Sequence, residues 1–470
     1  MQTQPAVKNY FFGKCYSDIF HLLDKTWKRT TSPIVKEWER LKTLFRRNVF
    51  AALISLICDL VVFPVISVVI LVFNAIFSLL MAIACLLIAA VIFPCYSVVY
   101  AVDGLFCFFR GISSHCPTCQ KKFLLPSYLC PKCKRMHTEL RPSKYGIFHR
   151  KCTCGHKLPT TFFNGRQSLE AACAYCGTKL KDGGNHIEIS IPVVGGPSAG
   201  KTCFISMAIS QIEKTASVNG LDFSYSPTVG DDFSANKSAM EHGNVPLKTN
   251  DSRLKYYQFY LTPTNVKLKN LISLCDIAGE AYDSNEEIGS QIGYKYANAF
   301  LMVLDPLSVR KYREELGDKI SLAKYGASKM EMDDILSVLI TTLENMKCLT
   351  SKNMVKTDVA VVFSKCDIPG LEDKIGSTAV RRYMQQNHIK STYEATNHVC
   401  EQFLTDYEED NFLNSLRSKF KSVQFFTCSA LGHVVNGRPF EPTGVEDPVL
   451  WVVDKASASI DLKQKWGKKI

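Results

Sequence analysis

The sequence predicts an α/β domain over residues 185–470, with a mostly parallel sheet and helices on both faces, behind a membrane segment and a cysteine-rich module. Three observations carry this prediction. Several short apolar runs in the carboxyl-terminal part each end in small or acidic residues, one apolar stretch is too long for a soluble core, and eight cysteines form four close pairs. A chain of 470 residues is long enough for about two to four structural units.

The net charge of +12 is concentrated in the first 182 residues. The basic segment, residues 1–48, carries +6, and the apolar segment, residues 49–110, carries −1. The cysteine-rich module, residues 111–182, carries +10, and the remainder carries −3. An anionic partner is therefore expected at the amino-terminal part. Of the 19 cysteines, eight are paired and eleven are scattered, which argues against disulfides and for a reducing compartment with metal sites.

The apolar segment is predicted to form a transmembrane helical hairpin. Between Leu60 and Val102 there are 43 consecutive uncharged residues, and one helix of that length would be roughly 65 Å long, about twice the hydrocarbon thickness. The polar Asn74 marks the expected turn between two helices, 49–73 and 75–101. Because basic residues flank both ends, the amino terminus, the cysteine-rich module and the α/β domain are expected in the cytoplasm. A re-entrant hairpin that does not span the bilayer is the main alternative, and a buried soluble helical hairpin is the less favoured one.

The cysteine-rich module is predicted to hold two structural zinc ions. Two thiolates on one tight turn, met by two from a second turn, make a closed tetrahedral zinc site with no open position for catalysis. Taken in chain order, the pairs predict two zinc ribbons: Cys116, Cys119, Cys130 and Cys133, then Cys152, Cys154, Cys173 and Cys176. A cross-braced pairing is the alternative. The nearby histidines are interpreted as spectators: His115, His137, His149 and His156.

The cations of this module have two interpretations. They offset the negative charge of the thiolate centres, and they suit anionic lipid headgroups. Nucleic acid is the less favoured partner, because aromatic residues are sparse among these cations. We expect a membrane bilayer and an unidentified protein effector as partners, and self-association is left open.

A phosphate-binding loop is predicted directly after a buried strand, Ile187–Val194. The loop consists of Gly195, Gly196, Pro197, Ser198, Ala199, Gly200, Lys201 and Thr202, and a helix-like sequence starts at Cys203. In this strand–loop–helix context the backbone amides hold phosphates, Lys201 reaches the β- and γ-phosphate oxygens, and Thr202 coordinates Mg²⁺.

Later apolar runs end in residues that complete such a site. The run 268–275 ends at Asp276, placed to hold Mg²⁺ through water, and Gly279 lies where its amide would meet a γ-phosphate. Another buried strand is expected at 299–306. Two further runs end in Ser364, Lys365, Cys366 and Asp367, and in Ser429, Ala430 and Leu431.

In this order, the motifs resemble those of the translation-factor-related (TRAFAC) GTPases over about residues 185–456, so a P-loop GTPase fold is expected. The resemblance implies that Asp367 binds both edge N–H groups of guanine, that Lys365 stacks on the base, and that Ser429, Ala430 and Leu431 complete the pocket. Ser364 stands where that class has Asn or Thr, and its hydroxyl is expected to keep one hydrogen bond to the loop.

More narrowly, the cysteine pairs, the P-loop and the late motif VEDPVLWVV resemble the bacterial double-GTPase clade. Members of that clade couple a GTPase domain to zinc ribbons and membrane segments, and they are associated with conflict and defence systems. The resemblance therefore implies GTP or GDP, Mg²⁺ and two structural zinc ions as bound groups.

Hydrolysis is expected to depend on Lys201, Thr249 and Glu280. Thr249 is the favoured switch threonine, since its spacing to Asp276 suits the role better than that of Thr228. Glu280 stands where many such switches carry a Gln that orients the attacking water. The sequence predicts a membrane-anchored, GTP-hydrolysing switch. The alternatives are a membrane scaffold that binds nucleotide without turnover, and an ATPase.

Overall fold

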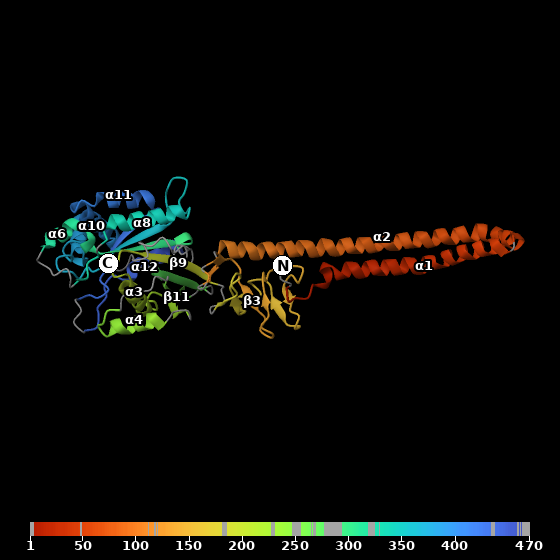
Figure 1. Ribbon diagram of the computed structural model, residues 1–470, viewed down its shortest axis with the longest axis horizontal. Coiled ribbons are helices and arrows are strands. Elements are labelled where there is room, and N and C mark those ends of the chain that lie inside the picture. The colour runs from red at the N-terminus through yellow and green to blue at the C-terminus, as the bar shows by residue number, and fades with distance from the viewer. Residues whose placement is uncertain are drawn as a thin grey trace. The chain divides into compact units, whose positions relative to one another are not determined.

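The computed structural model describes residues 4–47, 49–110, 112–116, 119, 121–180, 186–226, 231–246, 255–264, 266, 269–276, 294–317, 325–328, 330–433, 438–457, 460 and 462. The chain forms two compact units. Unit 1 comprises residues 1–110 and 125–172, and unit 2 comprises residues 111–124 and 173–470. Several elements of each unit are labelled in Figure 1.

The amino-terminal part of unit 1 is a hairpin of two long helices (Figure 1). The short 3₁₀ helix η1 (Tyr10–Phe12) leads into α1 (Lys14–Arg47), and α2 covers Val49–Phe109. Phe12 contacts the ring of Phe93, and Trp27 Nε1 donates to Ser78 Oγ at 3.0 Å. The later residue of the first segment, Trp27, meets the earlier residue of α2, Ser78, so α1 and α2 run antiparallel.

The predicted turn at Asn74 is wrong, because α2 is one continuous helix of 61 residues, about 90 Å long. Asn74 is fully buried, and its side-chain amide exchanges two hydrogen bonds with the Thr30 hydroxyl, at 2.7 and 2.9 Å. A polar group in an apolar helix needs a partner, and α1 supplies it without a turn. The hairpin is thus built from α1 and α2 rather than from residues 49–101 alone.

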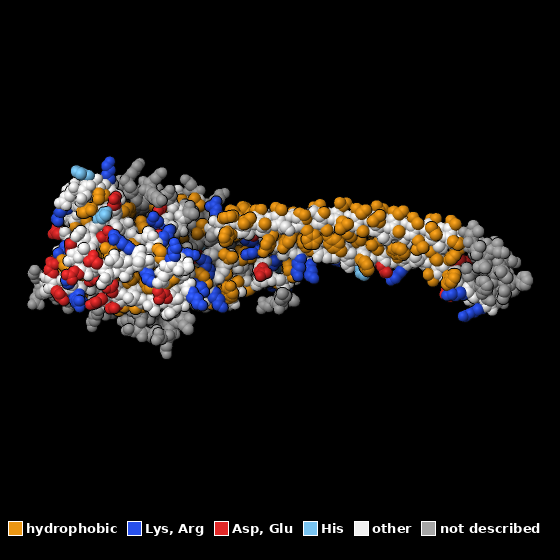
Figure 2. Space-filling model, turned by 90° about the horizontal axis from the view of Figure 1, so that it is seen from above, with side chains coloured by type: hydrophobic (Ala, Val, Ile, Leu, Met, Phe, Trp, Pro, Cys, Tyr) orange, Lys and Arg blue, Asp and Glu red, His pale blue; other side chains and the backbone are white. Residues whose placement is uncertain are grey.

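Within α2, the stretch Val62–Phe109 is long and apolar enough to cross a membrane, with a mean hydropathy of 3.0 in its most apolar window. In the described part of the chain, one helix is long and apolar enough to cross a membrane, whereas the sequence predicted two such helices. Figure 2 shows the corresponding band of hydrophobic side chains along the hairpin.

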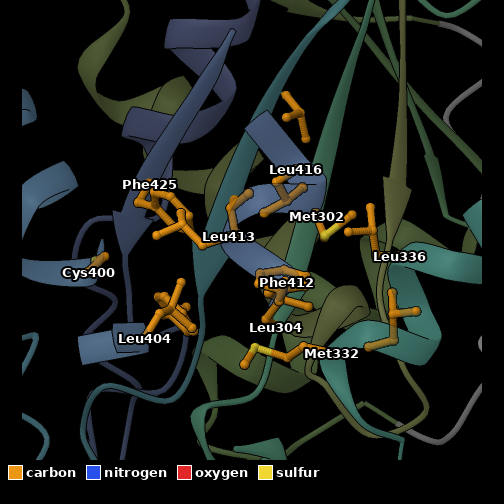
Figure 3. Packing of buried hydrophobic residues seen from close by; sticks show 14 of the residues in the cluster. Met302, Leu304, Met332, Leu336, Cys400, Leu404, Phe412, Leu413, Leu416 and Phe425 are labelled. Atoms are coloured by element: carbon orange, nitrogen blue, oxygen red, sulfur yellow. The ribbon is translucent and has the colours of Figure 1, made fainter. Parts of the chain in front are cut away.

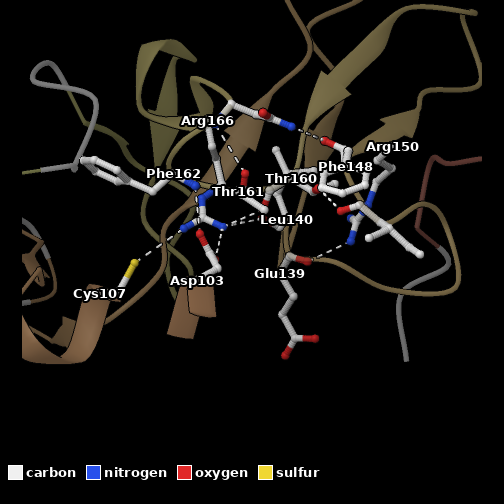
Figure 4. A network of polar contacts seen from close by, with 12 residues as sticks. Asp103, Cys107, Glu139, Leu140, Phe148, Arg150, Thr160, Thr161, Phe162 and Arg166 are labelled. Atoms are coloured by element: carbon white, nitrogen blue, oxygen red, sulfur yellow. Dashed lines mark hydrogen bonds and ion pairs between the residues drawn. The ribbon is translucent and has the colours of Figure 1, made fainter. Parts of the chain in front are cut away.

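The rest of unit 1 is a small module of short strands that ends at Ala172. Its antiparallel pairs are β3 with β4, β3 with β7, and β5 with β6. Two fully buried arginines tie its loops together (Figure 4), and Arg150 donates to the carbonyl oxygens of Thr138 (3.1 Å) and Glu139 (2.7 Å). The elements are β3 (Ser127–Leu129), β4 (Met136–His137), β5 (His149–Lys151), β6 (Lys157–Pro159), η2 (Arg166–Ser168) and β7 (Ala171–Ala172).

Unit 2 is built on a seven-stranded sheet with the order β10-β11-β12-β9-β13-β14-β15. The five strands from β12 to β15 in this order are parallel, and β10 and β11 are antiparallel to their neighbours. The predicted mostly parallel sheet is confirmed. Its strands are β9 (Ile187–Val194), β10 (Leu221–Tyr225), β11 (Lys255–Pro263), β12 (Asn270–Asp276), β13 (Ala299–Leu304), β14 (Asp358–Phe363) and β15 (Val423–Thr427).

Helices cover both faces of this sheet and form two hydrophobic clusters, one on each side. Figure 3 shows part of the first cluster, in which Met302 and Leu304 of β13 pack with Leu336, Leu404 and other apolar side chains. The helices are α3 (Lys201–Thr215), α4 (Asp231–Glu241), η4 (Pro306–Ser308), α6 (Arg310–Leu316), α8 (Met332–Asn345), α9 (Ser377–Asn387), α10 (Thr392–Asp406), α11 (Asp410–Lys419) and α12 (Glu446–Ala456).

Three short strands precede this sheet within unit 2: β1 (Ser114–His115), β2 (Lys122–Phe123) and β8 (Lys179–Leu180). Ile112 forms an antiparallel bridge with Ile187 at the start of β9, and β1 pairs with β2. Part of the cysteine-rich module therefore belongs to the same compact unit as the α/β sheet.

Candidate nucleotide-binding site

The P-loop connects β9 to α3, and two glycines explain its path. A Cβ on Gly195 would lie 2.2 Å from the carbonyl oxygen of Val303, so only glycine fits beside β13. Gly200 has a left-handed backbone with φ 86° and directly precedes the first residue of α3. The first N–H groups of a helix have no partner within it, so the amino end of α3 offers donors to an anion.

Lys201, Thr202 and Asp276 come together from the start of α3 and the end of β12. Lys201 Nζ donates to the carbonyl oxygens of Gly195 (2.7 Å) and Gly196 (3.1 Å), so the loop backbone holds the ammonium group. Thr202 Oγ1 donates to Asp276 Oδ2 at 2.9 Å. Burial lowers the pKa of Lys201 and raises the pKa of Asp276, and the opposite charge of the other residue counteracts each shift.

The pair of Thr202 and Asp276 fits a magnesium ion. Both offer oxygen, the ligand type that Mg²⁺ requires, and the carboxylate is 5% exposed. A Mg²⁺ ion typically uses one or two protein groups together with substrate phosphates and water. Thr202 would hold it directly and Asp276 through water, beside the loop that binds phosphates.

The residues predicted to contact the base lie after β14 and β15. The Ser364 hydroxyl is 2.8 Å from the Ala199 carbonyl oxygen, which links this motif to the P-loop. Asp367 Oδ1 accepts a hydrogen bond from the Ser429 hydroxyl (2.5 Å), and Ser429 Oγ accepts one from the Gly432 amide (2.8 Å). The structure thus joins two motifs that are 62 residues apart into one polar site.

Asp305, directly after β13, is a residue of this site that the sequence motifs missed. It is 1% exposed, and its Oδ2 lies 2.7 Å from Lys365 Nζ, which also donates to the Gly326 carbonyl oxygen at 2.9 Å. Its Oδ1 accepts from the Leu307 amide at 2.9 Å, so the carboxylate is held in place by the chain that follows. The signal in the sequence was an acid at the end of an apolar strand, the same signal that marks Asp276.

The remaining predicted residues divide into two groups. Thr249, Gly279 and Glu280 lie outside the described residues, as does the alternative Thr228. The others occupy the loop and its surroundings: Pro197 and Ser198 in the P-loop, Cys203 in α3, and Ala430 and Leu431 beside a core cluster. Burial raises the pKa of Cys203 to about 11, so this thiol stays protonated at neutral pH.

The eight paired cysteines form two clusters, but the predicted grouping is wrong. Cys116 and Cys119 meet Cys173 and Cys176, whereas Cys130 and Cys133 meet Cys152 and Cys154. The pairs are therefore nested rather than sequential or cross-braced, because β3, Ser127–Leu129, pairs with β7, Ala171–Ala172, and brings the first and last pairs near one another. One cluster lies in each compact unit.

The sulfur geometry of both clusters is compatible with zinc. Within each cluster the Sγ atoms lie within 4.8 Å of one another, with contacts of 3.4–3.6 Å across the pairs. Four thiolates about 2.3 Å from a central ion have comparable separations. Hydrogen bonds lower the pKa of Cys176 to about 6, chiefly from Thr178, and that of Cys154 to about 7, chiefly from the backbone at His156. Both shifts favour the thiolates that bind metal.

The described histidines lie outside both clusters. His137 is fully buried on β4, and burial, reinforced by the charge of Arg150, lowers its pKa to about 4. The imidazole is therefore neutral at physiological pH.

Lys201 and Thr202 of the P-loop meet Asp276 at the end of β12, and Ser364, Lys365 and Asp367 follow β14 in the same sheet. Together they define the α/β domain as a P-loop GTPase. Residues 189–419 match the model of the Double-GTPase 2 family, and the match supports a P-loop GTPase of the double-GTPase type. This assignment supports GTP binding.

Among solved structures, the chain is similar to one described as the crystal structure of the S. cerevisiae Ski7 GTPase-like domain bound to GTP, at 13% sequence identity and a TM-score of 0.25. That match covers 52% of this chain and 43% of the other. No curated protein matches the chain.

Proposed function

We propose that the protein is a membrane-attached GTPase switch that binds and hydrolyses GTP with the help of Mg²⁺. The observation that carries this proposal is the hydrogen bond between Ser364 Oγ and Ala199 O, because it holds the base motif against the phosphate loop. Phosphate-binding and base-binding residues thereby share the carboxyl edge of one parallel sheet, where ligands of such folds bind.

Each polar side chain has a role in this proposal. Lys201 stabilises the negative charge that develops on the β- and γ-phosphate oxygens, and it leaves the carbonyls of Gly195 and Gly196 to do so. The Asp367 carboxylate accepts hydrogen bonds from the two edge N–H groups of guanine, and adenine does not offer this pair of donors. Mg²⁺, when bound, neutralises charge on the phosphates. The Thr202 hydroxyl and the Asp276 carboxylate, which lie side by side, provide oxygen atoms of the kind that this ion binds.

Glu280 is the proposed residue for turnover. A carboxylate can accept a hydrogen bond from the attacking water, but it adds negative charge near the γ-phosphate. We therefore propose GTP hydrolysis that is slow without a protein partner.

Attachment to a membrane is proposed from α2, whose described apolar residues are extensively exposed. The two cysteine clusters are proposed to be structural zinc sites, since all eight ligands are thiols and leave no open coordination position.

The test is nucleotide binding and phosphate release by the full-length protein in detergent. We expect tight GDP binding and much weaker ADP binding; equal affinities would overturn the GTPase assignment. Lys201→Ala should weaken GTP binding by about 10- to 100-fold, as expected for a lost hydrogen bond to a charged group. Lys214→Ala, at the exposed end of the same helix, is the matched control and should bind normally.

Turnover is tested separately with Glu280→Gln. An increase or a loss of phosphate release with unchanged GDP affinity would place Glu280 in the hydrolytic step. Tight GDP binding without turnover by the wild-type protein, with membranes added, would instead identify a nucleotide-binding scaffold.

A further inference from the structure

The helical hairpin of unit 1 has two different faces. α2 meets α1 on the side that carries Asn74 and Ser78, which lie one helical turn apart. The opposite side of α2 is apolar and exposed over its described length. Its residues include Val65 (59% exposed), Leu79 (61%), Leu86 (69%), Val91 (68%) and Val98 (60%).

α1 is strongly charged, although it also exposes Phe20, Val35 and Trp38. Between Lys14 and Arg47 the sequence has nine Lys and Arg and four Asp and Glu, a net charge of +5. Lys28 and Asp24 form an ion pair at 2.8 Å in which both side chains are largely exposed. α1 thus has the charge of a helix that lies in water or among anionic headgroups, not in hydrocarbon.

A bilayer-spanning orientation of this hairpin is unfavourable on two counts. The apolar stripe of α2 from Val62 to Val102 is about 60 Å long, roughly twice the hydrocarbon thickness. Moreover, Trp27 contacts Ser78 near the centre of that stripe, so spanning would draw the neighbouring Asp24 and Lys28 of α1 into the bilayer interior.

The carboxyl end of α2 gives a further constraint. Asp103 is 3% exposed because the module of unit 1 covers it, and Phe106 packs on Phe162 and Phe163 of that module. One side of the last turns of α2 is therefore already buried in protein, whereas Leu105, Phe108 and Phe109 are exposed. Across residues 62–109, one side of the helix is occupied by α1 or by this module, and the other side is exposed.

We propose that the α1–α2 hairpin lies flat on an anionic bilayer, with the outer face of α2 embedded and α1 at the level of the headgroups. An embedded depth of about 5–10 Å suffices for an in-plane helix. Packed helices have axes about 8–10 Å apart, which puts α1 and its excess of Lys and Arg among the phosphates. This proposal rests on the membrane attachment proposed above and replaces spanning by in-plane insertion.

The depth of α2 along its length tests the proposal. Full-length protein is bound to vesicles of phosphatidylcholine with phosphatidylglycerol, and a nitroxide is attached through p-azidophenylalanine at Val65, Leu79, Leu86 or Val98, which leaves the cysteines unchanged. Accessibility to oxygen and to a water-soluble nickel complex then gives the depth of each label. We expect the same shallow depth at all four positions, and a label at Lys28 should stay accessible to nickel. A depth that rises to the bilayer centre and falls again would overturn the proposal.

Two variants separate this proposal from nucleotide binding. Leu79→Lys combined with Leu86→Lys places cations on the embedded face and should weaken vesicle binding by about tenfold or more, while GDP affinity is unchanged. Lys28→Gln combined with Arg29→Gln should reduce the preference for phosphatidylglycerol over pure phosphatidylcholine. If wild-type protein with normal GDP affinity fails to bind either vesicle, the bilayer is not the partner of this face and the proposal fails. A loss of GDP binding in the wild type would instead contradict the proposed function.

Discussion

The Asp103 carboxylate on α2 lies 2.8 Å from the Arg166 guanidinium, and the two side chains are only 4% and 2% exposed. Arg166 Nη1 also donates to the carbonyl oxygens of Leu140 (3.1 Å) and Thr160 (2.6 Å), and Asp103 Oδ1 accepts from the Phe162 amide at 2.8 Å (Figure 4). Both charges have further hydrogen-bond partners, which favours a buried ion pair, although Arg166 Nε is buried without a partner among the described residues. The pair joins the long helix to the small module within unit 1.

Asp103→Asn should loosen this module selectively. The substitution leaves Arg166 buried with a neutral partner, and loss of one member of a buried pair costs about 3–5 kcal/mol. We expect faster amide hydrogen exchange over residues 125–172 and unchanged exchange in the sheet of unit 2. Asp24→Asn removes the exposed pair with Lys28 and is the control, with an expected effect of about 0–1 kcal/mol. Equal exchange in both variants would show that the buried pair does not hold the module.

The nested grouping of cysteines predicts zinc content in a way that the sequential grouping does not. Cys116→Ser with Cys176→Ser changes one cluster only, so elemental analysis should show a fall from two zinc ions per chain to one. Cys116→Ser with Cys130→Ser changes both clusters and should lose both ions. Sequential ribbons would give the opposite zinc contents for these two variants. Two ions retained in both variants would contradict zinc binding by these thiols.

Local sequence patterns predicted the strands of the sheet in unit 2, but they did not predict contacts between residues that are distant in the sequence. The strand Ile187–Val194 was predicted with its observed bounds, because a β-branched apolar run stops at Gly195, where the loop must turn. Hydropathy could not show that Thr30 satisfies Asn74, so a buried amide was interpreted as a turn.

The cysteine grouping failed for the same reason. Each Cys pair is recognisable by its spacing, but its partner pair depends on strand pairing between Ser127–Leu129 and Ala171–Ala172, which is not encoded locally. Lys365 and Asp305 are 60 residues apart in the sequence, so local motifs could not predict their contact either.

Asp305→Asn is expected to weaken guanine nucleotide binding. The carboxylate holds Lys365 Nζ at 2.7 Å, and an amide nitrogen at that place would repel the ammonium group that is proposed to lie along the base. A hydrogen bond to a charged group contributes about 1.5–3 kcal/mol, so GDP affinity should fall by about 10- to 100-fold. Calorimetric titration with GDP measures this effect.

The matched control for Asp305 is Asp373→Asn, which removes an exposed pair with Arg382 and should leave GDP affinity unchanged. Thermal unfolding of both variants distinguishes lost binding from lost folding. Unchanged GDP affinity in a folded Asp305→Asn variant would show that the pair with Lys365 has no part in nucleotide binding.

The buried Asp276 carboxylate is expected to make nucleotide binding depend on both pH and Mg²⁺. Burial raises the pKa of Asp276, so its proton is retained at a higher pH than in an exposed aspartate, while Mg²⁺ requires the ionised carboxylate. The gain in GDP affinity on adding Mg²⁺ should therefore shrink as the pH falls through this raised pKa. The folding stability of the Mg²⁺-free protein should depend on pH in the opposite direction. Because the pKa of the Asp276 carboxyl is raised in the folded protein, this group contributes stability at low pH that is lost as the pH rises.

Asp276→Asn removes the titrating carboxyl. GDP affinity should then no longer respond to Mg²⁺, and the Mg²⁺-free protein should lose less stability between acidic and neutral pH. Asp222→Asn, at an exposed position on β10, is the control and should keep the wild-type behaviour. GDP titrations with and without Mg²⁺ across the acidic range measure the first effect, and thermal unfolding measures the second. If Mg²⁺ raises the GDP affinity of Asp276→Asn as much as that of the wild type, this carboxylate does not hold the ion.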